Sequence, residues 1–360
     1  MIKTVVVGMS GGVDSSVSAF LLKNQGYRVI GLFMKSWEEL DERGICKTSL
    51  EYEDVIRVCQ QLQIPSYSVN LVKEYQERIF ATFLADLKKG LTPNPDVLCN
   101  REIKFNVFLQ KAQECGADLL ATGHYCRLDS QHRLLKGIDP DKDQSYFLHA
   151  VQQEALTRVL FPIGHLHKTE VRAIARKASL ITAEKKDSTG ICFIGKRNFK
   201  SFLSKYLGYH SGNFCRLNGE IVGRHDGVAF YTIGQRKGMG LGGAGEAWFV
   251  VGKDIARNEV YVERGAHHPA LFANNLIASR LTWIAEAPPF YPYPCTAKIR
   301  YRQEAKPCTL FAEGNGRVHV VFDDLQRAIT PGQSIVFYKG DICLGGARIE
   351  SENHNVSRET

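Results

Sequence analysis

An apolar strand that runs into a serine- and glycine-rich loop constrains the fold of this 360-residue chain more than any other feature. Val5–Gly8 predicts a buried strand, Ser10-Gly11-Gly12-Val13-Asp14-Ser15-Ser16 predicts a tight turn, and Val17–Asn24 predicts a helix. Two adjacent glycines permit close approach of the backbone, and amide groups at the start of a helix, together with serine hydroxyls, can bind phosphate oxygens. The segment therefore predicts an α/β domain that binds a nucleotide.

The loop lacks the lysine of loops that transfer a γ-phosphoryl group. In the pattern G-x-x-x-x-G-K-[ST] that lysine holds the β- and γ-phosphates. Here Asp14 occupies the middle of the loop, which favours a different use of ATP. The alternative interpretation is a glycine-rich turn that binds no ligand, and the order of strand, turn and helix argues against it.

The pattern S-G-G-x-D-S resembles the PP-loop of ATP pyrophosphatases. That resemblance implies cleavage of ATP between its α- and β-phosphates and transfer of AMP to an oxygen of the substrate. It leaves the acceptor open, because GMP synthetases, NAD synthetases, argininosuccinate synthetases and several tRNA-modifying enzymes share the loop.

Further β-rich runs follow at spacings typical of strand–helix–strand units. Arg28–Phe33, Pro65–Asn70 and Asp118–Thr122 alternate with helical stretches, which predicts a parallel sheet. Ligands of such sheets bind at the carboxyl ends of the strands. We therefore expect Met34 and Gly123, which follow two of these runs, to lie beside the nucleotide.

The second half of the chain changes to short β-type runs between turn residues, after a linker that begins at Gly208. A second break falls near Gly265. The sequence thus predicts a Rossmann-like PP-loop domain (adenine nucleotide α-hydrolase type) over residues 1–207, a small β-rich central domain over 208–270, and an antiparallel C-terminal β-barrel over 271–360.

Charge and composition limit the partners and the compartment. The net charge is +8 and its excess begins after residue 100, which makes a polyanionic partner plausible. The sequence shows no leader and no apolar run of the ~20 residues that span a bilayer, so we expect a cytoplasmic protein without a membrane partner. The ten cysteines include no C-x-x-C pair, so we expect reduced thiols and no metal site.

Two cysteines lie in settings that suggest chemistry. Cys99 falls just before a predicted helix, Arg101–Glu114, with Arg101 and Lys104 close by, and Cys192 lies in a glycine-flanked segment after Lys185. Positive charge and a helix N-terminus lower the pKa of a thiol, so both are candidates for exposed, reactive thiols. The alternative for each is a small buried apolar residue, and spacing alone does not pair the two.

Seven segments occur in the order found in bacterial tRNA-specific 2-thiouridylases, and the chain resembles that family from Lys3 to Ile349. The segments are SGGVDSS, TPNPDVLCN, ATGHY, DKDQSYFL, KKDSTGICFIG, YTIGQRKG and KIRYR. The resemblance implies a three-domain enzyme that thiolates carbon 2 of the wobble uridine in tRNAs for Lys, Glu and Gln. It also implies the use of ATP with Mg²⁺ and of a persulfide delivered by a sulfur-relay protein.

The same resemblance implies a role for individual residues. Cys192 would carry the persulfide, Cys99 would be the nucleophile that resolves it through a transient disulfide, and Asp96 would act as general acid/base. The ATP-binding residues would be Gly8, Met9, Ser10, Gly11, Gly12, Val13, Asp14, Ser15, Met34 and Gly123. The target base would meet Asn94, Pro95 and Asp96, and the rest of the tRNA would meet Lys142, Asp143, Gln144, Arg300 and Tyr301.

Two other functions remain open from the sequence. A PP-loop tRNA thiolase with an iron–sulfur cluster would need three or more clustered thiolate ligands, and the absence of C-x-x-C argues against it. A tRNA-binding module without catalysis is the second alternative, and the intact ATP loop and both cysteines argue against that.

Overall fold

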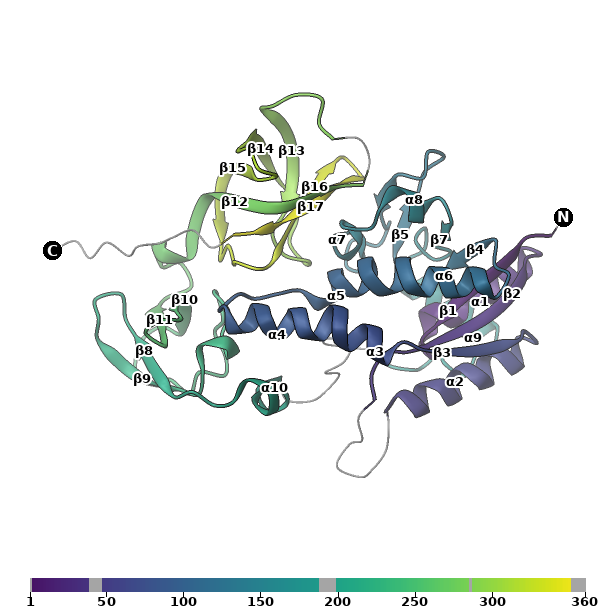
Figure 1. Ribbon diagram of the computed structural model, residues 1–360, viewed down its shortest axis with the longest axis horizontal. Helices are drawn as coiled ribbons and strands as arrows, with labels where there is room; N and C mark the ends of the chain where they lie inside the picture. Colours follow the sequence, from purple (N-terminus) through teal and green to yellow (C-terminus); the bar gives the residue numbers. More distant parts are fainter. Residues whose placement is uncertain (1, 39–46, 188–198, 285–286, 351–360) are drawn as a thin grey trace.

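The computed structural model describes residues 2–38, 47–187, 199–284 and 287–350. These residues form three sheets, which Figure 1 shows as a parallel sheet near the N-terminus, a small sheet in the middle of the chain and a barrel at its end. The predicted fold class, a parallel-sheet PP-loop domain followed by a β-rich part and an antiparallel barrel, is confirmed.

The five-stranded sheet of the first part is parallel throughout, with the order β3-β2-β1-β4-β7. Its strands are β1 (Thr4–Met9), β2 (Arg28–Lys35), β3 (Ser66–Asn70), β4 (Leu119–Ala121) and β7 (Val159–Leu160). The strand order reverses between β1 and β4, so the carboxyl ends of these two strands form the switch point where ligands of such sheets bind.

Helices cover both faces of this sheet, because alternate residues of β1 point to opposite sides. Val5 and Val7 pack with α1 (Val13–Asn24), α2 (Lys47–Gln61) and α9 (Lys168–Lys177). Val6 packs on the other side, among the second set of helices. These are α3 (Val72–Tyr75), η1 (Gln76–Phe80), α4 (Ala81–Lys88), α5 (Pro95–Leu98), η2 (Cys99–Val107) and α6 (Phe108–Glu114).

Two of these helical segments, η1 and η2, are π-helical. The backbone of η2 leaves helical geometry at Phe105 (φ −99°, ψ 19°). Such π-helical segments are rare and often mark functional positions in a helix. In this chain η2 begins at Cys99.

Four short elements and one helix complete the first part: α7 (Ser145–Leu148), α8 (Gln153–Leu156), β5 (Cys126–Leu128), β6 (Leu134–Lys136) and α10 (Phe199–Leu207). The hairpin of β5 and β6 does not join the parallel sheet. It extends the sheet of the barrel, where Leu135 pairs with Ile342 of β17 and Arg127 bonds to Asp341 at 2.8 Å. The sequence did not predict this connection.

The central sheet has the order β10-β11-β8-β9. Its strands are β8 (Gly212–Cys215), β9 (Ile221–His225), β10 (Trp248–Asp254) and β11 (Glu259–Arg264), and the short helix η3 (Val228–Phe230) follows β9. Phe214, Val250, Val260 and Val262 are fully buried and belong to the same apolar cluster as the helices around η2. The central sheet therefore packs on the first part of the chain rather than standing apart from it.

The barrel follows the short helix η4 (Pro269–Leu271) and closes because β12 pairs with both β15 and β17. Its strands are β12 (Phe272–Trp283), β13 (Tyr293–Lys298), β14 (Lys306–Ala312), β15 (Val318–Arg327), β16 (Ser334–Lys339) and β17 (Ile342–Ile349). Closure leaves no open edge between the first and last strands. The boundaries 1–207, 208–270 and 271–360 remain our proposal for the domains.

Gly345 makes the closure of the barrel geometrically feasible. It has φ +143°, and a Cβ at this position would collide with the backbone oxygen of Thr282 on β12. We expect Gly345→Ala to lower the free energy of unfolding by about 2 kcal/mol or more, because the alanine would have a strained backbone and its methyl group would clash with Thr282. Urea denaturation followed by circular dichroism measures this change.

The matched control is Gly340→Ala in the turn between β16 and β17. Gly340 also has a positive φ (+60°), but a Cβ there would meet no atom within 4 Å. We expect a loss of about 1 kcal/mol from the backbone conformation alone. Equal losses for the two variants would contradict the role assigned to the β12–β17 contact.

A buried polar contact joins the first part of the chain to the barrel. His149, after α7, has its Nε2 2.9 Å from the Ser334 hydroxyl, and the Tyr146 hydroxyl donates to the Ser334 carbonyl at 2.8 Å. The His149 side chain is only 5% exposed. Burial lowers the pKa of His149 from 6.5 to about 3, with a smaller contribution from the positive charge of Arg101.

This pKa shift predicts a loss of stability in mild acid. Between pH 6.5 and pH 3 the unfolded chain binds a proton at His149 that the folded protein does not, so stability is complete above pH 6.5 and falls as the pH falls. For His149→Gln we expect the difference in unfolding free energy between pH 7 and pH 5.5 to shrink by about 1 kcal/mol. Urea denaturation at both pH values measures it, and an unchanged difference would show that His149 does not titrate this way.

Candidate active site

The predicted phosphate loop lies at the switch point between β1 and β4, directly before α1. Ser10 and Gly11 connect the strand to Gly12, which caps the helix without a side-chain hydrogen bond. The Ser15 hydroxyl accepts a bond from the Ser10 amide at 3.2 Å, and the Ser16 hydroxyl donates to the Gly12 carbonyl at 2.8 Å. These bonds fix a loop that presents its backbone amides at the positive end of α1, as anion binding requires.

Glycine is required at two positions of this site. Gly11 has φ +71°, and a Cβ there would lie 2.6 Å from the Glu51 carbonyl oxygen. Gly123, just after β4, packs so closely on the loop that a Cβ would lie 2.9 Å from the Asp14 carbonyl carbon and from the Ser15 amide nitrogen. The structure thus brings the predicted Gly123 against the loop, although the two are far apart in the sequence.

The other predicted ATP-binding residues lie at the two ends of this loop or on the neighbouring strand β2. Met9 and Val13 are buried, so the atoms that they offer a nucleotide are those of the backbone. Gly8 pairs with Leu32 of β2, and Met34 lies two residues further along β2, half-buried at the carboxyl end of the sheet. Direct contact of Met34 with a nucleotide stays a prediction.

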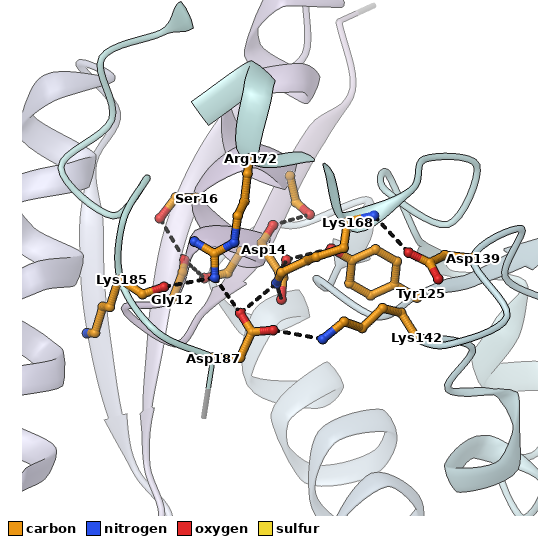
Figure 2. A network of polar contacts seen from close by, with 12 residues as sticks. Gly12, Asp14, Ser16, Tyr125, Asp139, Lys142, Lys168, Arg172, Lys185 and Asp187 are labelled. Atoms are coloured by element: carbon orange, nitrogen blue, oxygen red, sulfur yellow. Dashed lines mark hydrogen bonds and ion pairs between the residues drawn. The ribbon is translucent and has the colours of Figure 1, made fainter. Parts of the chain in front are cut away.

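Ion pairs surround Asp14 in the loop (Figure 2). Lys168, the first residue of α9, has its Nζ 2.7 and 2.8 Å from the two carboxylate oxygens of Asp14 and 2.9 Å from Asp187. The Tyr125 hydroxyl donates to Asp14 at 2.7 Å, and burial, together with the negative charge of Asp14, raises the pKa of that hydroxyl far above its usual range. Asp14 is therefore held from two sides.

Asp187 is the second carboxylate of this network. Lys142 donates to it at 2.8 Å and Arg172 at 2.8 Å, in addition to Lys168. Partial burial acts to raise the pKa of Asp187, but Lys142 and Lys168 outweigh it and hold that pKa at about 2. Lys185 completes the group with bonds to the Gly11 carbonyl at 2.8 Å and to Asp54 at 2.5 Å. We call Lys142, Lys168, Arg172 and Lys185 the cation cluster.

Lys168, Arg172 and Asp187 are not among the site residues predicted from the sequence. Lys168 lies 154 residues after Asp14, in a helix with no motif of its own, so local patterns gave no signal. Asp187 belongs to the quoted segment KKDSTGICFIG, and that segment was the one clue available. The parallel sheet brings these residues together at one edge.

The target-base segment lies at the start of α5. The Asn94 side chain accepts a bond from the Asp96 amide at 3.1 Å and Pro95 occupies the first helical turn, so the helix begins six residues before the predicted start at Arg101. The earlier start turns Cys99 inward, where its side chain is 1% exposed in the apolar cluster. The prediction of an exposed Cys99 thiol is therefore wrong for this structure.

Cys192, the predicted persulfide cysteine, lies outside the described residues, since the structure describes the chain up to Asp187 and again from Phe199. Its role and its pairing with Cys99 stay predictions. Asp187, the last described residue before that segment, is the carboxylate held by the cation cluster.

Two of the predicted tRNA-binding segments lie side by side. The Tyr301 ring packs on Phe147 at 4.4 Å between ring centroids, and the Tyr301 hydroxyl donates to the Lys142 carbonyl at 3.5 Å. Gln144 is tied to the Tyr125 backbone, whose amide donates to its side chain at 3.0 Å. Lys142 therefore belongs both to the cation cluster and to the region around Tyr301.

Asp143 and Arg300, two of the predicted tRNA-binding residues, make contacts within the protein, and their contact with tRNA stays a prediction. Asp143 is 3% exposed and forms an ion pair with Lys298 at 3.1 Å, because a buried carboxylate must be paired. The Arg300 guanidinium donates to the carbonyls of Ile233 and Ala328 and to the Thr330 hydroxyl. In this structure both side chains connect parts of the protein.

Neither a metal centre nor a membrane helix emerges from the described residues. Within the described ranges, no three His, Cys, Asp or Glu side chains gather in a way that could hold a metal ion. No helix in those ranges is long and apolar enough to cross a bilayer.

Fold and site together define the class of this protein, which is that of ATP-binding enzymes with a PP-loop. Three family models match consecutive parts of the chain. Residues 3–196 match the tRNA methyl transferase HUP domain, residues 200–264 the tRNA methyl transferase PRC-barrel domain, and residues 273–349 the aminomethyltransferase beta-barrel domain.

Curated relatives of this chain have a common name. The chain is 62% identical over 352 residues to the tRNA-specific 2-thiouridylase MnmA of Protochlamydia amoebophila, which covers 97% of this chain and 93% of the relative. It is 55% identical over 350 residues to the enzyme of that name from Bacillus subtilis, with 96% and 94% covered. The chain belongs to the MnmA family of tRNA-specific 2-thiouridylases.

One solved structure with a slight likeness is the U34-tRNA thiolase NcsA from Methanococcus maripaludis with its [4Fe-4S] cluster. It has a TM-score of 0.36 and 18% identity, and covers 57% of this chain and 67% of that one. A likeness of that size supports no conclusion about function.

Substitution of Gly123 tests the geometry of the loop. We expect Gly123→Ala to raise the KM for ATP about 10-fold or more, because the new methyl group displaces the Asp14–Ser15 backbone from its phosphate-binding position. Initial-rate measurements at varied ATP concentration give this value. Gly242→Ala is the control, since a Cβ at Gly242 meets no atom within 4 Å, and an equal effect of both substitutions would contradict the assignment.

Proposed function

We propose that this chain is a tRNA-uridine 2-sulfurtransferase that uses ATP and releases AMP and pyrophosphate. The observation that carries the proposal is the phosphate loop without a lysine, which lies in the same domain as the Asn94–Cys99 segment, in a chain of this family. The substrate is the wobble uridine of tRNAs for Lys, Glu and Gln.

The first step activates the uracil. The carbon 2 carbonyl of uracil is a poor electrophile, so its oxygen attacks the α-phosphorus of ATP. The bond between the α-phosphorus and the bridging oxygen breaks, and pyrophosphate leaves with the electron pair. Carbon 2 then carries AMP as a leaving group. The loop amides and α1 stabilise the negative charge of the phosphates during this step.

The second step transfers sulfur. The terminal sulfur of a persulfide on Cys192 attacks carbon 2, and AMP leaves with the former carbonyl oxygen. The Cys99 thiolate, once its side chain has moved out of the apolar cluster, then attacks the Cys192 sulfur and releases the thiolated tRNA, which leaves a Cys99–Cys192 disulfide. A thiol reductant restores both cysteines. Asp96 acts as the general acid/base. Asn94 holds the Asp96 backbone in place at the start of α5.

The tRNA is recognised by the region around Lys142, Gln144 and Tyr301, which offers a cation, an amide and an aromatic ring close together. A base reaches such a site only when it leaves its stack, so the wobble nucleotide is flipped out. Asn94, Pro95 and Asp96 receive the flipped base.

Mg²⁺ would accompany ATP and would supply positive charge that offsets the charge of the phosphates. Among the described residues no three metal-ligating side chains gather at one place, so the protein would contribute few ligands of its own. Asp14, the carboxylate of the loop, is the residue that would help to hold the ion. A sulfur-relay protein delivers the sulfur to Cys192. The reaction takes place in the cytoplasm, where tRNA and ATP are present.

Mass spectrometry of tRNA tests the proposal. We expect 2-thiouridine at the wobble position after incubation of the protein with ATP, Mg²⁺, a persulfide donor and tRNA for Lys, Glu or Gln. Protein purified without oxygen and free of iron should give the same product, whereas activity that requires an iron–sulfur cluster would contradict the persulfide route. Absence of thiolated tRNA with all components present would contradict the function.

Substitution of Cys192 tests its role. We expect Cys192→Ser to abolish thiolation and to change tRNA affinity less than 2-fold, because the cysteine supplies chemistry and not binding energy. Cys115→Ser is the matched control, as Cys115 is an exposed cysteine after α6. Undiminished turnover of Cys192→Ser, with product quantified as above and affinity measured by filter binding, would refute the role.

A further inference from the structure

We propose that Lys168 is the phosphate-binding lysine of the ATP site, which contacts the β- and γ-phosphates and then the departing pyrophosphate. The inference deepens the proposed function and rests on it for the identity of the acceptor. The start of α9 thus supplies the lysine that the loop lacks, and the Lys168 side chain extends to Asp14 of the loop (Figure 2).

The backbone of Lys168 is fixed while its side chain holds exchangeable partners. The Lys168 amide donates to Asp139 at 2.8 Å, and Glu170 accepts a bond from the His167 amide at 2.7 Å in the first turn of α9. The Nζ contacts carboxylate oxygens of Asp14 and Asp187 at 2.7–2.9 Å. A phosphate oxygen can replace a carboxylate oxygen at such a position without leaving an ammonium group unpaired.

Lys168 differs from the other members of the cation cluster in the groups to which its side chain donates hydrogen bonds. Arg172 donates to the carbonyls of Ala183 and Lys185, and Lys185 donates to the Gly11 carbonyl, so these two side chains support the backbone of the site. Lys142 donates to Asp187, which is not part of the loop. Lys168 contacts Asp14, the carboxylate of the loop itself.

A fixed cation beside Asp14 lowers the electrostatic cost of ATP binding. The loop directs phosphate oxygens toward α1, whose first turn contains Asp14, and like charges close together disfavour binding. The Lys168 side chain is 12% exposed, so its charge is screened less than that of a surface lysine. The ammonium group lies beside Asp14 and reduces the repulsion. It also stabilises the charge that develops on the bridging oxygen as pyrophosphate leaves.

The proposal explains why Asp14 is compatible with a phosphate loop. Before ATP binds, Asp14 and Asp187 hold the Lys168 ammonium group between them, with the Tyr125 ring 5.7 Å from it. The carboxylates therefore position the lysine in advance, and the entropic cost of ordering a long side chain is met before the nucleotide arrives. Asp14 acts as a positioning residue and Lys168 as a catalytic residue.

Nucleotides of different length test the inference. Isothermal titration calorimetry compares the wild-type protein with Lys168→Met, Lys168→Arg and Lys168→Gln for pyrophosphate, a non-hydrolysable ATP analogue and AMP. We expect Lys168→Met to weaken pyrophosphate and analogue binding at least 10-fold and AMP binding less than 2-fold, because AMP has no β-phosphate. Lys168→Gln should behave like Lys168→Met, and Lys168→Arg should retain part of the affinity.

Kinetics provides the second measurement. In pyrophosphate release with tRNA present, we expect Lys168→Met to lower kcat about 100-fold or more, as loss of one charge-stabilising donor does in other active sites. Lys177→Met, an exposed position at the other end of α9, is the matched control and should leave both binding and turnover unchanged. Circular dichroism checks that each variant is folded.

Two results would overturn the inference. One is equal weakening of AMP and pyrophosphate, which would indicate a structural role, and the other is unchanged pyrophosphate affinity in both Lys168→Met and Lys168→Gln. Failure of the proposed function would look different: wild-type protein would bind pyrophosphate and the ATP analogue through Lys168 but would release no pyrophosphate in the presence of tRNA.

Discussion

The close packing of the end of β4 against the start of α1 is the constraint on which the site depends. The loop can approach β4 because Gly123 has no side chain at the point where the Asp14–Ser15 backbone passes. This approach aligns the start of α1 with the carboxyl ends of β1 and β4, and it places Asp14 within reach of α9 and Tyr125. The anion-binding amides and the cation cluster therefore face the same space, a combination suited to a polyphosphate.

A buried ion pair connects this edge of the sheet to the barrel. The Asp143 carboxylate accepts bonds from the amides of Gly137 and Ser145 at 3.1 Å and pairs with Lys298 of β13. Such a pair contributes little net stability, but removal of one partner leaves an unpaired buried charge that costs about 3–5 kcal/mol. The pair thus fixes the position of residues 137–145 relative to the barrel, and with them Lys142 beside Tyr301.

The sequence predicted those features that local patterns carry. The loop, the parallel strands and the barrel follow from runs of apolar residues and turn residues, and the ATP-binding segment followed from its glycines. Cys99 was misplaced because the helix start was read at Arg101, although Asn94 and Pro95 form a standard capping arrangement that could have corrected it. The contact of Lys168 with Asp14 joins residues 154 positions apart in the sequence, and the residues that pair between β6 and β17 are further apart still. Periodicity in a single sequence gives no signal for contacts of this kind.

Lys142 connects the charged network around Asp14 and Asp187 to the region around Tyr301. Its Nζ bonds to Asp187 in the charged network, and its carbonyl accepts a bond from Tyr301 on the aromatic side. The charged network and the Tyr301 side chain are therefore linked through one residue. Because Asp143 anchors the adjacent backbone, the position of this residue is set by the packing of the barrel on the parallel sheet. The barrel thus contributes to the geometry of the candidate active site.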